Sequence, residues 1–234
     1  TGSFGHASFF SFEPTKPVNT YGGGMVVTGD PELAQFVRDR VEKLPLDAAT
    51  LVKKAATTQK EKLLTGTGLA LPLLLLLAFP RGKALVSRAY RGAQTVPSGG
   101  ARYHPAQARM GMARLGTLPG RLAARRRSAA LLKSLLDPSV RVQELLPGAE
   151  STWYFFVVVL PKGAAAMRAP LLARHGVDVA IEEEIADECA RILGRDDCPG
   201  VAGVYPNAAA LPMFDDISGG EVRRVAAAVN RLVR

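Results

Sequence analysis

The stretch "SFEPTKPVNTYGGGMVVTGD" (residues 11–30) places one lysine, Lys16, between two prolines and follows it with three consecutive glycines. Pro14 and Pro17 restrict their own φ angles and therefore stiffen the chain on both sides of the lysine. The glycines at 22–24 allow a tight turn and a close approach of the backbone to a neighbouring group. A lysine on an ordinary solvated surface needs none of these features. The stretch therefore indicates a lysine that is held at a fixed place.

Short apolar runs flank this lysine loop and predict two buried strands, 8–12 and 23–28. A helix is expected next, because Asp30 is a suitable N-cap and Pro31 suits the first turn. Its apolar residues would share one face: Leu33, Phe36, Val37 and Val41. The sequence thus predicts a lysine loop that is anchored at both ends.

The composition limits the class of protein. The chain has 234 residues, of which 47% are hydrophobic, enough for one large or two small domains with a core. Its two cysteines, Cys189 and Cys198, have neither the partners of a disulfide framework nor the spacing of a metal site. We therefore expect no metal site and a reducing, cytoplasmic location.

Positive charge is concentrated in one segment. The net charge is +9, and 81–133 contains twelve Lys and Arg residues but no Asp or Glu. Such a segment attracts anions, or else forms a solvated basic helix face. Nucleic acid is the less favoured anion, because only Tyr90 and Tyr103 are available there to stack on bases. We therefore expect no nucleic-acid partner.

An apolar run, "LALPLLLLLAFP" (69–80), precedes the basic segment. It is too short to span a bilayer, which requires about 20 residues. Burial against protein is the favoured interpretation. The alternative is a peripheral contact of Leu69 to Phe79 with the inner membrane, because basic residues follow the run directly.

The remainder of the chain has a mixed α/β pattern. A helix should open at Pro105 and be interrupted at Pro119–Gly120. A strand (151–161), a helix (164–174) and a second strand (177–181) then predict a small α/β unit. Ser218 and Glu221 have the spacing of a capping box at the start of a last helix.

On residue spacing alone, Lys16 is either a structural lysine or a lysine that forms a Schiff base. A primary amine in a low-dielectric pocket has a depressed pKa, condenses with an aldehyde and can afterwards move a proton. Ser11, Phe12, Lys16 and the glycine pair at 23–24 stand in the order found in the DegT/StrS family of sugar aminotransferases, which this sequence resembles. The resemblance implies an α/β fold type I transferase that depends on pyridoxal 5'-phosphate (PLP).

The family resemblance also assigns roles to residues. It implies that Lys16 is the catalytic, cofactor-binding lysine and that the hydroxyl of Ser11 contacts the cofactor phosphate. "RYHPAQARMGMARL" (102–115) is similar to a helix of the family, and "ALPMFDDISGGEVRRV" (210–225) to its closing segment. Gly100 stands where the family commonly has an asparagine that reaches the phosphate in the neighbouring subunit. Another residue of the insert would have to replace that asparagine.

The resemblance further implies a domain division and a reaction. The expected parts are the end of the large cofactor domain (1–45), an apolar and basic helical insert (46–100), and a connecting helix with the small C-terminal α/β domain (101–234). Because the lysine stands near the start, we expect the C-terminal half of an enzyme that is inactive when isolated.

The expected reaction of the complete protein is amino transfer, with glutamate as donor, to a nucleotide-linked keto sugar used for polysaccharides or secondary metabolites. The full-length protein should form a homodimer. The alternative is a noncatalytic remnant of the same fold that binds a membrane surface or a partner.

Overall fold

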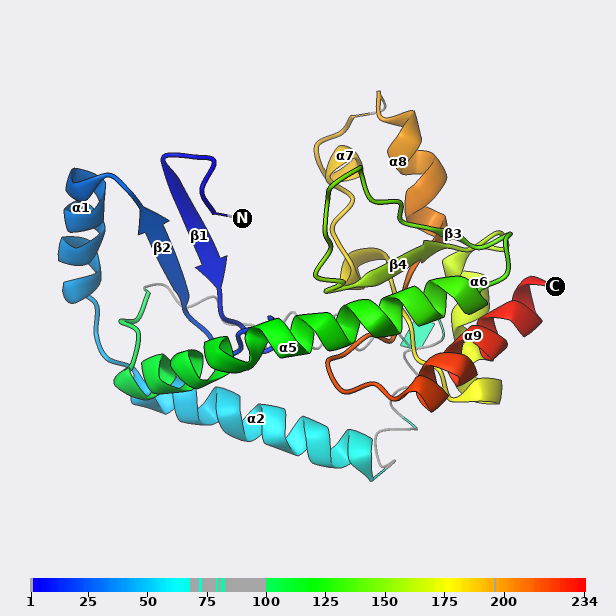
Figure 1. Cartoon of the computed structure of the whole chain (residues 1–234), viewed down its shortest axis with the longest axis horizontal. Coiled ribbons are helices and arrows are strands. Elements are labelled where there is room, and N and C mark those ends of the chain that lie inside the picture. The colour runs from blue at the N-terminus through cyan, green and yellow to red at the C-terminus, as the bar shows by residue number, and fades with distance from the viewer. Residues whose placement is uncertain (1, 68–71, 73–78, 80, 83–99, 196) are drawn as a thin grey trace. The chain divides into compact units, whose positions relative to one another are not determined.

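The computed structural model describes residues 2–67, 72, 79, 81–82, 100–195 and 197–234 (Figure 1). Contacts between Cα atoms divide the chain into two compact units. The N-terminal unit is built mainly from 2–67 and 100–119, and the C-terminal unit mainly from 120–195 and 197–234. The boundary between them falls inside helix α5 (Pro105–Leu135).

The N-terminal unit contains a two-stranded antiparallel sheet, β1 (Ala7–Ser11) and β2 (Gly24–Thr28), paired in register along all five residues. Helix α1 (Pro31–Glu42) follows directly, and the carboxylate of Asp30 accepts hydrogen bonds from the amides of its first turn. Helix α2 (Ala48–Gly66) comes next. The predicted strands and the Asp30 cap are therefore confirmed.

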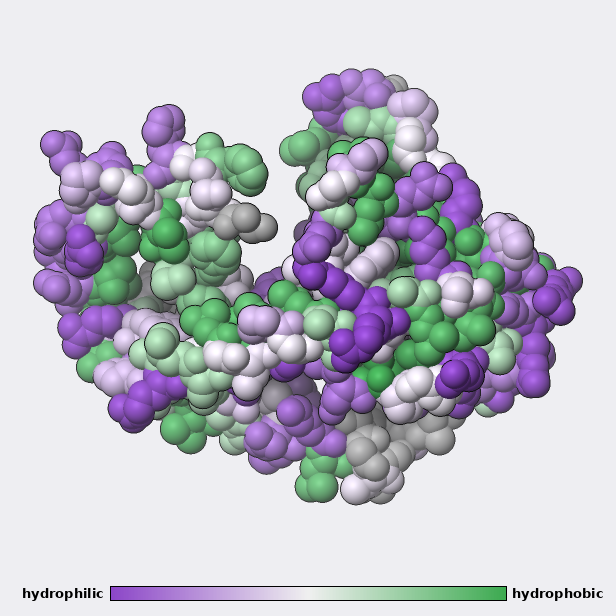
Figure 2. Space-filling model, in the orientation of Figure 1, coloured by the Kyte–Doolittle hydropathy of each residue, from purple (hydrophilic) through white to green (hydrophobic). Residues whose placement is uncertain are grey.

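The prediction that these two strands are buried is wrong. Phe9 of β1 is 85% exposed, and Met25, Val26 and Val27 of β2 are each more than 40% exposed. In the part of the chain that the structure describes, the sheet has two strands, and α1 packs beside β2. The apolar face of α1 is not buried either, since Phe36 is 55% exposed. Hydrophobic surface accordingly lies over this strand pair (Figure 2).

Helix α5 begins at Pro105, as predicted, but it is not interrupted at Pro119–Gly120. A proline inside a helix removes one backbone donor and crowds the preceding turn, at a cost of about 3 kcal/mol. Ala129 and Leu132, both on the continuation of the same helix, are completely buried in the C-terminal unit. Burial of that downstream face offsets the local cost of Pro119.

The C-terminal unit is built on a four-stranded antiparallel sheet in the order β3-β4-β6-β5. Its strands are β3 (Arg141–Val142), β4 (Phe156–Val159), β5 (Ala180–Ile181) and β6 (Ala208–Leu211). Its helices are α6 (Ala164–His175), α7 (Cys189–Ile192), α8 (Pro199–Val204) and α9 (Gly219–Val233), with short 3₁₀ turns at Glu182–Glu184 and Tyr205–Asn207.

A continuous hydrophobic core fills this second unit. Phe156 and Val158 of β4 are fully buried and belong to one cluster with residues of α5, α6 and α9. Along α9 the buried positions Val222, Val225 and Val229 recur every three or four residues, which is the period of one helix face. The unit therefore encloses its own core.

The predicted elements of this unit agree with the structure only in part. The predicted capping box of α9 is present, with Ser218 and Glu221 satisfying each other's backbone amides. The strand predicted over 151–161 covers only Phe156–Val159, and the one predicted over 177–181 only Ala180–Ile181. Strand β6 was not predicted, because its alanines have low β propensity.

The apolar run 69–80 lies almost entirely outside the described residues, so its predicted burial and the alternative contact with the inner membrane remain predictions. Within the described ranges, no helix is both long and apolar enough to cross a membrane.

Candidate functional site

Lys16 lies in a short loop whose base is closed by backbone hydrogen bonds. The carbonyl oxygen of Phe12 accepts from the amides of Thr20 (2.9 Å) and Gly22 (3.1 Å). These bonds bring the two ends of 13–19 together, with Lys16 at the centre of the segment. The loop therefore connects β1 to β2 and is closed at its base.

The loop is also ordered internally. The amide of Lys16 donates to the carbonyl of Glu13 (2.9 Å), which forms a turn directly before the lysine. Pro14 lies within this turn and Pro17 follows the lysine, so both prolines restrict the backbone around it. The predicted stiffening of the chain around Lys16 agrees with this geometry.

The glycines after the loop have the conformations predicted for them. Gly23 has a φ of 86°, and a Cβ atom there would lie 2.6 Å from the ring of Tyr103, closer than real contacts allow. Tyr21 also has a positive φ, 59°, and its amide donates to the side chain of Asn19 (2.7 Å). Tight turning and close approach both require glycine at position 23.

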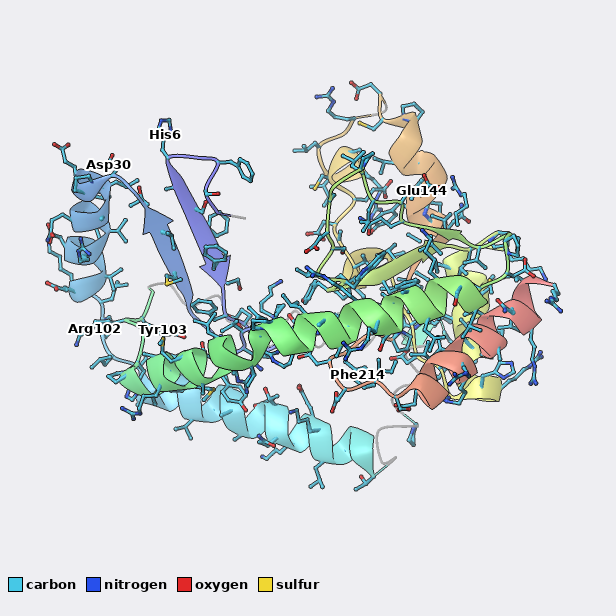
Figure 3. All side chains as sticks on the ribbon, viewed as in Figure 1. His6, Asp30, Arg102, Tyr103, Glu144 and Phe214 are labelled. Atoms are coloured by element: carbon cyan, nitrogen blue, oxygen red, sulfur yellow. The ribbon has the colours of Figure 1, made fainter. Side chains whose placement is uncertain are left out.

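A polar network joins this loop to the first turn of α5. The hydroxyl of Tyr103 donates to Oγ1 of Thr20 (2.8 Å), which in turn donates to the carbonyl of Gly22 (2.9 Å). Nε2 of Gln107 donates to the carbonyls of Thr20 and Gly22, each at 3.1 Å. Thr20 is completely buried and Gln107 is 8% exposed. Tyr103 is labelled beside the start of α5 in Figure 3.

Sequence reasoning missed this network. Gln107 lies in the stretch 102–115 that is similar to a family helix, and nothing in the sequence connects it with Thr20. A buried polar residue has a sequence signal only when its partner is close in the chain, and these contacts join residues 83 to 87 positions apart. The polar network around Thr20 is therefore a finding of the structure.

Ser11 and Lys16 both lie where β1 passes into the lysine loop. Ser11 is the last residue of β1, is exposed and pairs with Gly24, whereas Lys16 is half-buried. Both side chains belong to the described part of the N-terminal unit. Their roles toward a cofactor stay predictions.

A cavity of about 440 Å³ is lined in part by the glycine segment. Its walls include 22–24, Gly100, Arg102 and Lys54 of α2, whereas Lys16 does not line it. Nζ of Lys54 forms an ion pair with Glu13 at 3.1 Å. The predicted low-dielectric pocket around Lys16 is thus not this cavity. Gly100, the position that departs from the family pattern, lines the same cavity as Arg102 and Lys54.

Part of the basic segment 81–133 is neutralised within the C-terminal unit. Arg121 and Arg125 of α5 both bind Asp215, at 2.7 and 2.5 Å. Burial raises the pKa of Asp215, but the hydrogen bonds and charges of the two guanidinium groups outweigh it, so the pKa lies below its usual value. Arg126 pairs with Glu150 at 2.8 Å. These three arginines bind carboxylates of the protein itself.

The lysine loop and the small α/β unit together are features of a fold type I aminotransferase, and comparison with known proteins supports this class. Residues 1–230 match the sequence profile of the DegT/DnrJ/EryC1/StrS aminotransferase family. The chain belongs to this family. No curated protein is significantly similar to it in sequence.

Solved structures show the same fold at low sequence identity. The aminotransferase TlmJ from Streptoalloteichus hindustanus superposes with a TM-score of 0.66 and 20% identity, over 98% of this chain and 52% of TlmJ. DesI, solved with its TDP-sugar product, gives 0.67 and 21%, over 99% and 50%. The E. coli GDP-4-keto-6-deoxy-D-mannose-3-dehydratase, solved with bound hydrated PLP, gives 0.64 and 14%, over 98% and 55%.

The chain spans about half the length of each of these enzymes. The family match places the chain among aminotransferases. The activity and cofactor of the whole protein, its substrates and the residues that act in this chain are matters for proposal.

Proposed function

We propose that this chain is the lysine-bearing half of a PLP-dependent sugar aminotransferase. The complete enzyme would move an amino group, from glutamate as donor, to a keto sugar linked to a nucleotide diphosphate, for polysaccharide or secondary-metabolite synthesis. The observation that carries the proposal is the closed loop that fixes Lys16 five residues after Ser11 in a chain whose family profile covers 1–230. The TDP-sugar product bound to DesI supports this substrate class.

Two side chains of this chain suit PLP. The amine of Lys16 would join covalently to the aldehyde carbon, and the hydroxyl of exposed Ser11 would donate to the phosphate. When bound, the cofactor supplies an electron sink for the carbon that carries the amino group. The family resemblance implies that the partners of the ring and of its pyridine nitrogen lie in the N-terminal half of the enzyme.

Lys16 would have two tasks. Its Nζ would hold the cofactor before the amino donor enters and, once displaced and neutral, would take a proton from the donor carbon and return it to the cofactor carbon. Both tasks require the same nitrogen to stay within reach of two atoms. A loop closed at its base and stiffened by Pro14 and Pro17 limits how far this nitrogen can move.

The complete protein is further proposed to be a cytoplasmic homodimer. Cys189 and Cys198 are free thiols, which suits a reducing compartment. Gly100 cannot contact a cofactor phosphate through a side chain, and Lys54 of the insert lies on the same cavity wall. Lys54 is therefore our candidate to replace the asparagine of the family.

Reductive trapping tests the proposal. The protein is incubated with PLP, reduced with borohydride and digested, and the pyridoxyl group is located by mass spectrometry. We expect the label on Lys16 in clear excess over exposed Lys53, and no such label in Lys16→Arg. We expect binding to be weak, because most of the cofactor's family partners lie outside the matched half.

Two results would contradict the proposal. A label spread over lysines according to their exposure would favour the noncatalytic remnant. Tight, stoichiometric binding by this chain alone would contradict our account of which half it represents.

A further inference from the structure

One buried carboxamide holds the C-terminal end of the lysine loop's base. Gln107 is 8% exposed and stands in the first turn of α5, far from the loop in sequence. Both hydrogens of Nε2 are used, one on the carbonyl of Thr20 and one on that of Gly22. Its Oε1 accepts from the amide of His104 at 2.9 Å. Three hydrogen bonds therefore fix this side chain.

These partners allow only one orientation of the amide. Rotation by 180° would place Oε1 against two carbonyl oxygens and Nε2 against an amide hydrogen, so all three contacts would become repulsive. Glutamate has the same shape but, when ionised, has no donor for the two carbonyls. A buried acceptor that loses its donor costs more than an ordinary hydrogen bond contributes. Position 107 thus requires a donor pair that only glutamine supplies at this length.

The same two carbonyls belong to the residues that close the loop. The amides of Thr20 and Gly22 donate to Phe12, while their carbonyls are held by Gln107. The C-terminal end of 13–19 is therefore held by Phe12, directly after β1, and by Gln107 of α5. Because the segment is short, a shift of its base moves Lys16.

We infer that Gln107 is the positioning residue of Lys16: it acts through the backbone of Thr20 and Gly22 and touches no substrate. This inference rests on the proposed function of Lys16. Gln107 would hold the loop that carries Lys16, a task that neither the cofactor chemistry nor Ser11 fulfils.

Gln107→Glu gives a pH-dependent test. Near neutral pH the ionised carboxylate faces two carbonyls, and the protection of the Thr20 and Gly22 amides against hydrogen exchange should fall about tenfold. At about pH 5 the buried, protonated acid regains one donor, and part of the protection should return. Protection factors correct for the intrinsic pH dependence of exchange, and no cofactor is needed.

Two further variants complete the design. Gln107→Met has nearly the same length and no polar atom, so it should lose the protection at both pH values without recovery. Gln143→Glu introduces the same charge at an exposed position of the C-terminal unit and should change neither amide. Recovery confined to Gln107→Glu supports the inference, because a general loss of packing would not reverse on protonation. Unchanged Thr20 and Gly22 protection in both position-107 variants would overturn it.

The pyridoxyl label separates this inference from the proposed function. We expect labelling of Lys16 relative to Lys53 to fall several-fold in Gln107→Met. Equal labelling in all variants would overturn the positioning role while the function of Lys16 stands. If the wild-type protein shows no excess label on Lys16, the proposed function fails, and the exchange data alone report how Gln107 orders the loop.

Discussion

The two units of this chain bury apolar side chains to very different extents. In the C-terminal unit Phe156, Leu160 and Leu171 are completely inaccessible to solvent, whereas Phe9 of β1 is 85% exposed. Strands with apolar residues on both faces are typical of sheets that are covered on both sides. The C-terminal unit therefore has a hydrophobic core of its own, whereas the N-terminal unit is ordered by polar contacts around the lysine loop.

The largest predicted effect contrasts two phenylalanines. Phe156→Ala removes a ring at the centre of the C-terminal core and should lower the free energy of unfolding by about 3–5 kcal/mol. Phe9→Ala is the matched control and should change it by less than about 0.5 kcal/mol. Denaturant titration followed by circular dichroism measures both. Similar losses in the two variants would show that β1 is as well packed as β4.

A polar substitution in the C-terminal unit should have the next largest effect. Asp215→Asn removes a charge from two arginines, one of which, Arg125, has a side chain only 9% exposed. We expect a loss of about 2 kcal/mol near neutral pH, because Arg125 is left without a counterion.

The effect of Asp215 should depend on pH. Its folded-state pKa is lowered, so its stabilisation is present above the pKa of the unfolded chain and is lost as the pH falls through the folded-state value. The difference between Asp215→Asn and the wild type should therefore shrink below about pH 4. Thermal unfolding over this range measures it, and a difference that grows on acidification would exclude the lowered pKa.

The side chain that caps a helix can be removed in each of the two units. Ser218→Ala removes the capping box of α9, which packs on the core, and should cost about 1 kcal/mol of unfolding free energy. Asp30→Ala removes the cap of α1, which has no buried residue, and should fray that helix without lowering the stability of the C-terminal unit. Residue-resolved hydrogen exchange distinguishes the two. A global loss in Asp30→Ala would mean that the units unfold together.

The smallest predicted effect concerns the ion pair beside the cavity. Lys54 and Glu13 have side chains 42% and 45% exposed, so Lys54→Ala should cost less than about 1 kcal/mol, and less again in high salt. Chemical denaturation at low and high salt measures this. A loss comparable with that of Phe156→Ala would show that the pair, rather than the polar network, orders the N-terminal unit.

Features set by neighbouring residues were predictable from the sequence. Asp30 and Pro31 at the start of α1, and Ser218 and Glu221 at the start of α9, depend on the local backbone, and the structure has them as predicted. The tight turn at the glycines 22–24 was predicted similarly, and the structure shows it in the positive φ of Gly23.

Features set by distant residues were not predictable. Exposure of β1 and β2 depends on which layers cover them, and the contact of Gln107 with Thr20 joins residues 87 positions apart. The continuity of α5 through Pro119 depends on the burial of Leu132. The surroundings that bury Leu132 exist only in the folded C-terminal unit. Resemblance to the family identified Lys16 and Ser11 as candidates, but not the network that holds the loop.

Hydrogen exchange of the whole chain tests the contrast between the units most directly. We predict that amides of β4, β6 and α9 exchange only through global unfolding, and that amides of β1 and β2 exchange at least about a hundredfold faster through local opening. The amides of Thr20 and Gly22, held in the loop base, should be slower than those of the strands beside them. Equal protection of β1 and β4 would contradict the account, because it would mean that the N-terminal strands are already as stably packed as the C-terminal core.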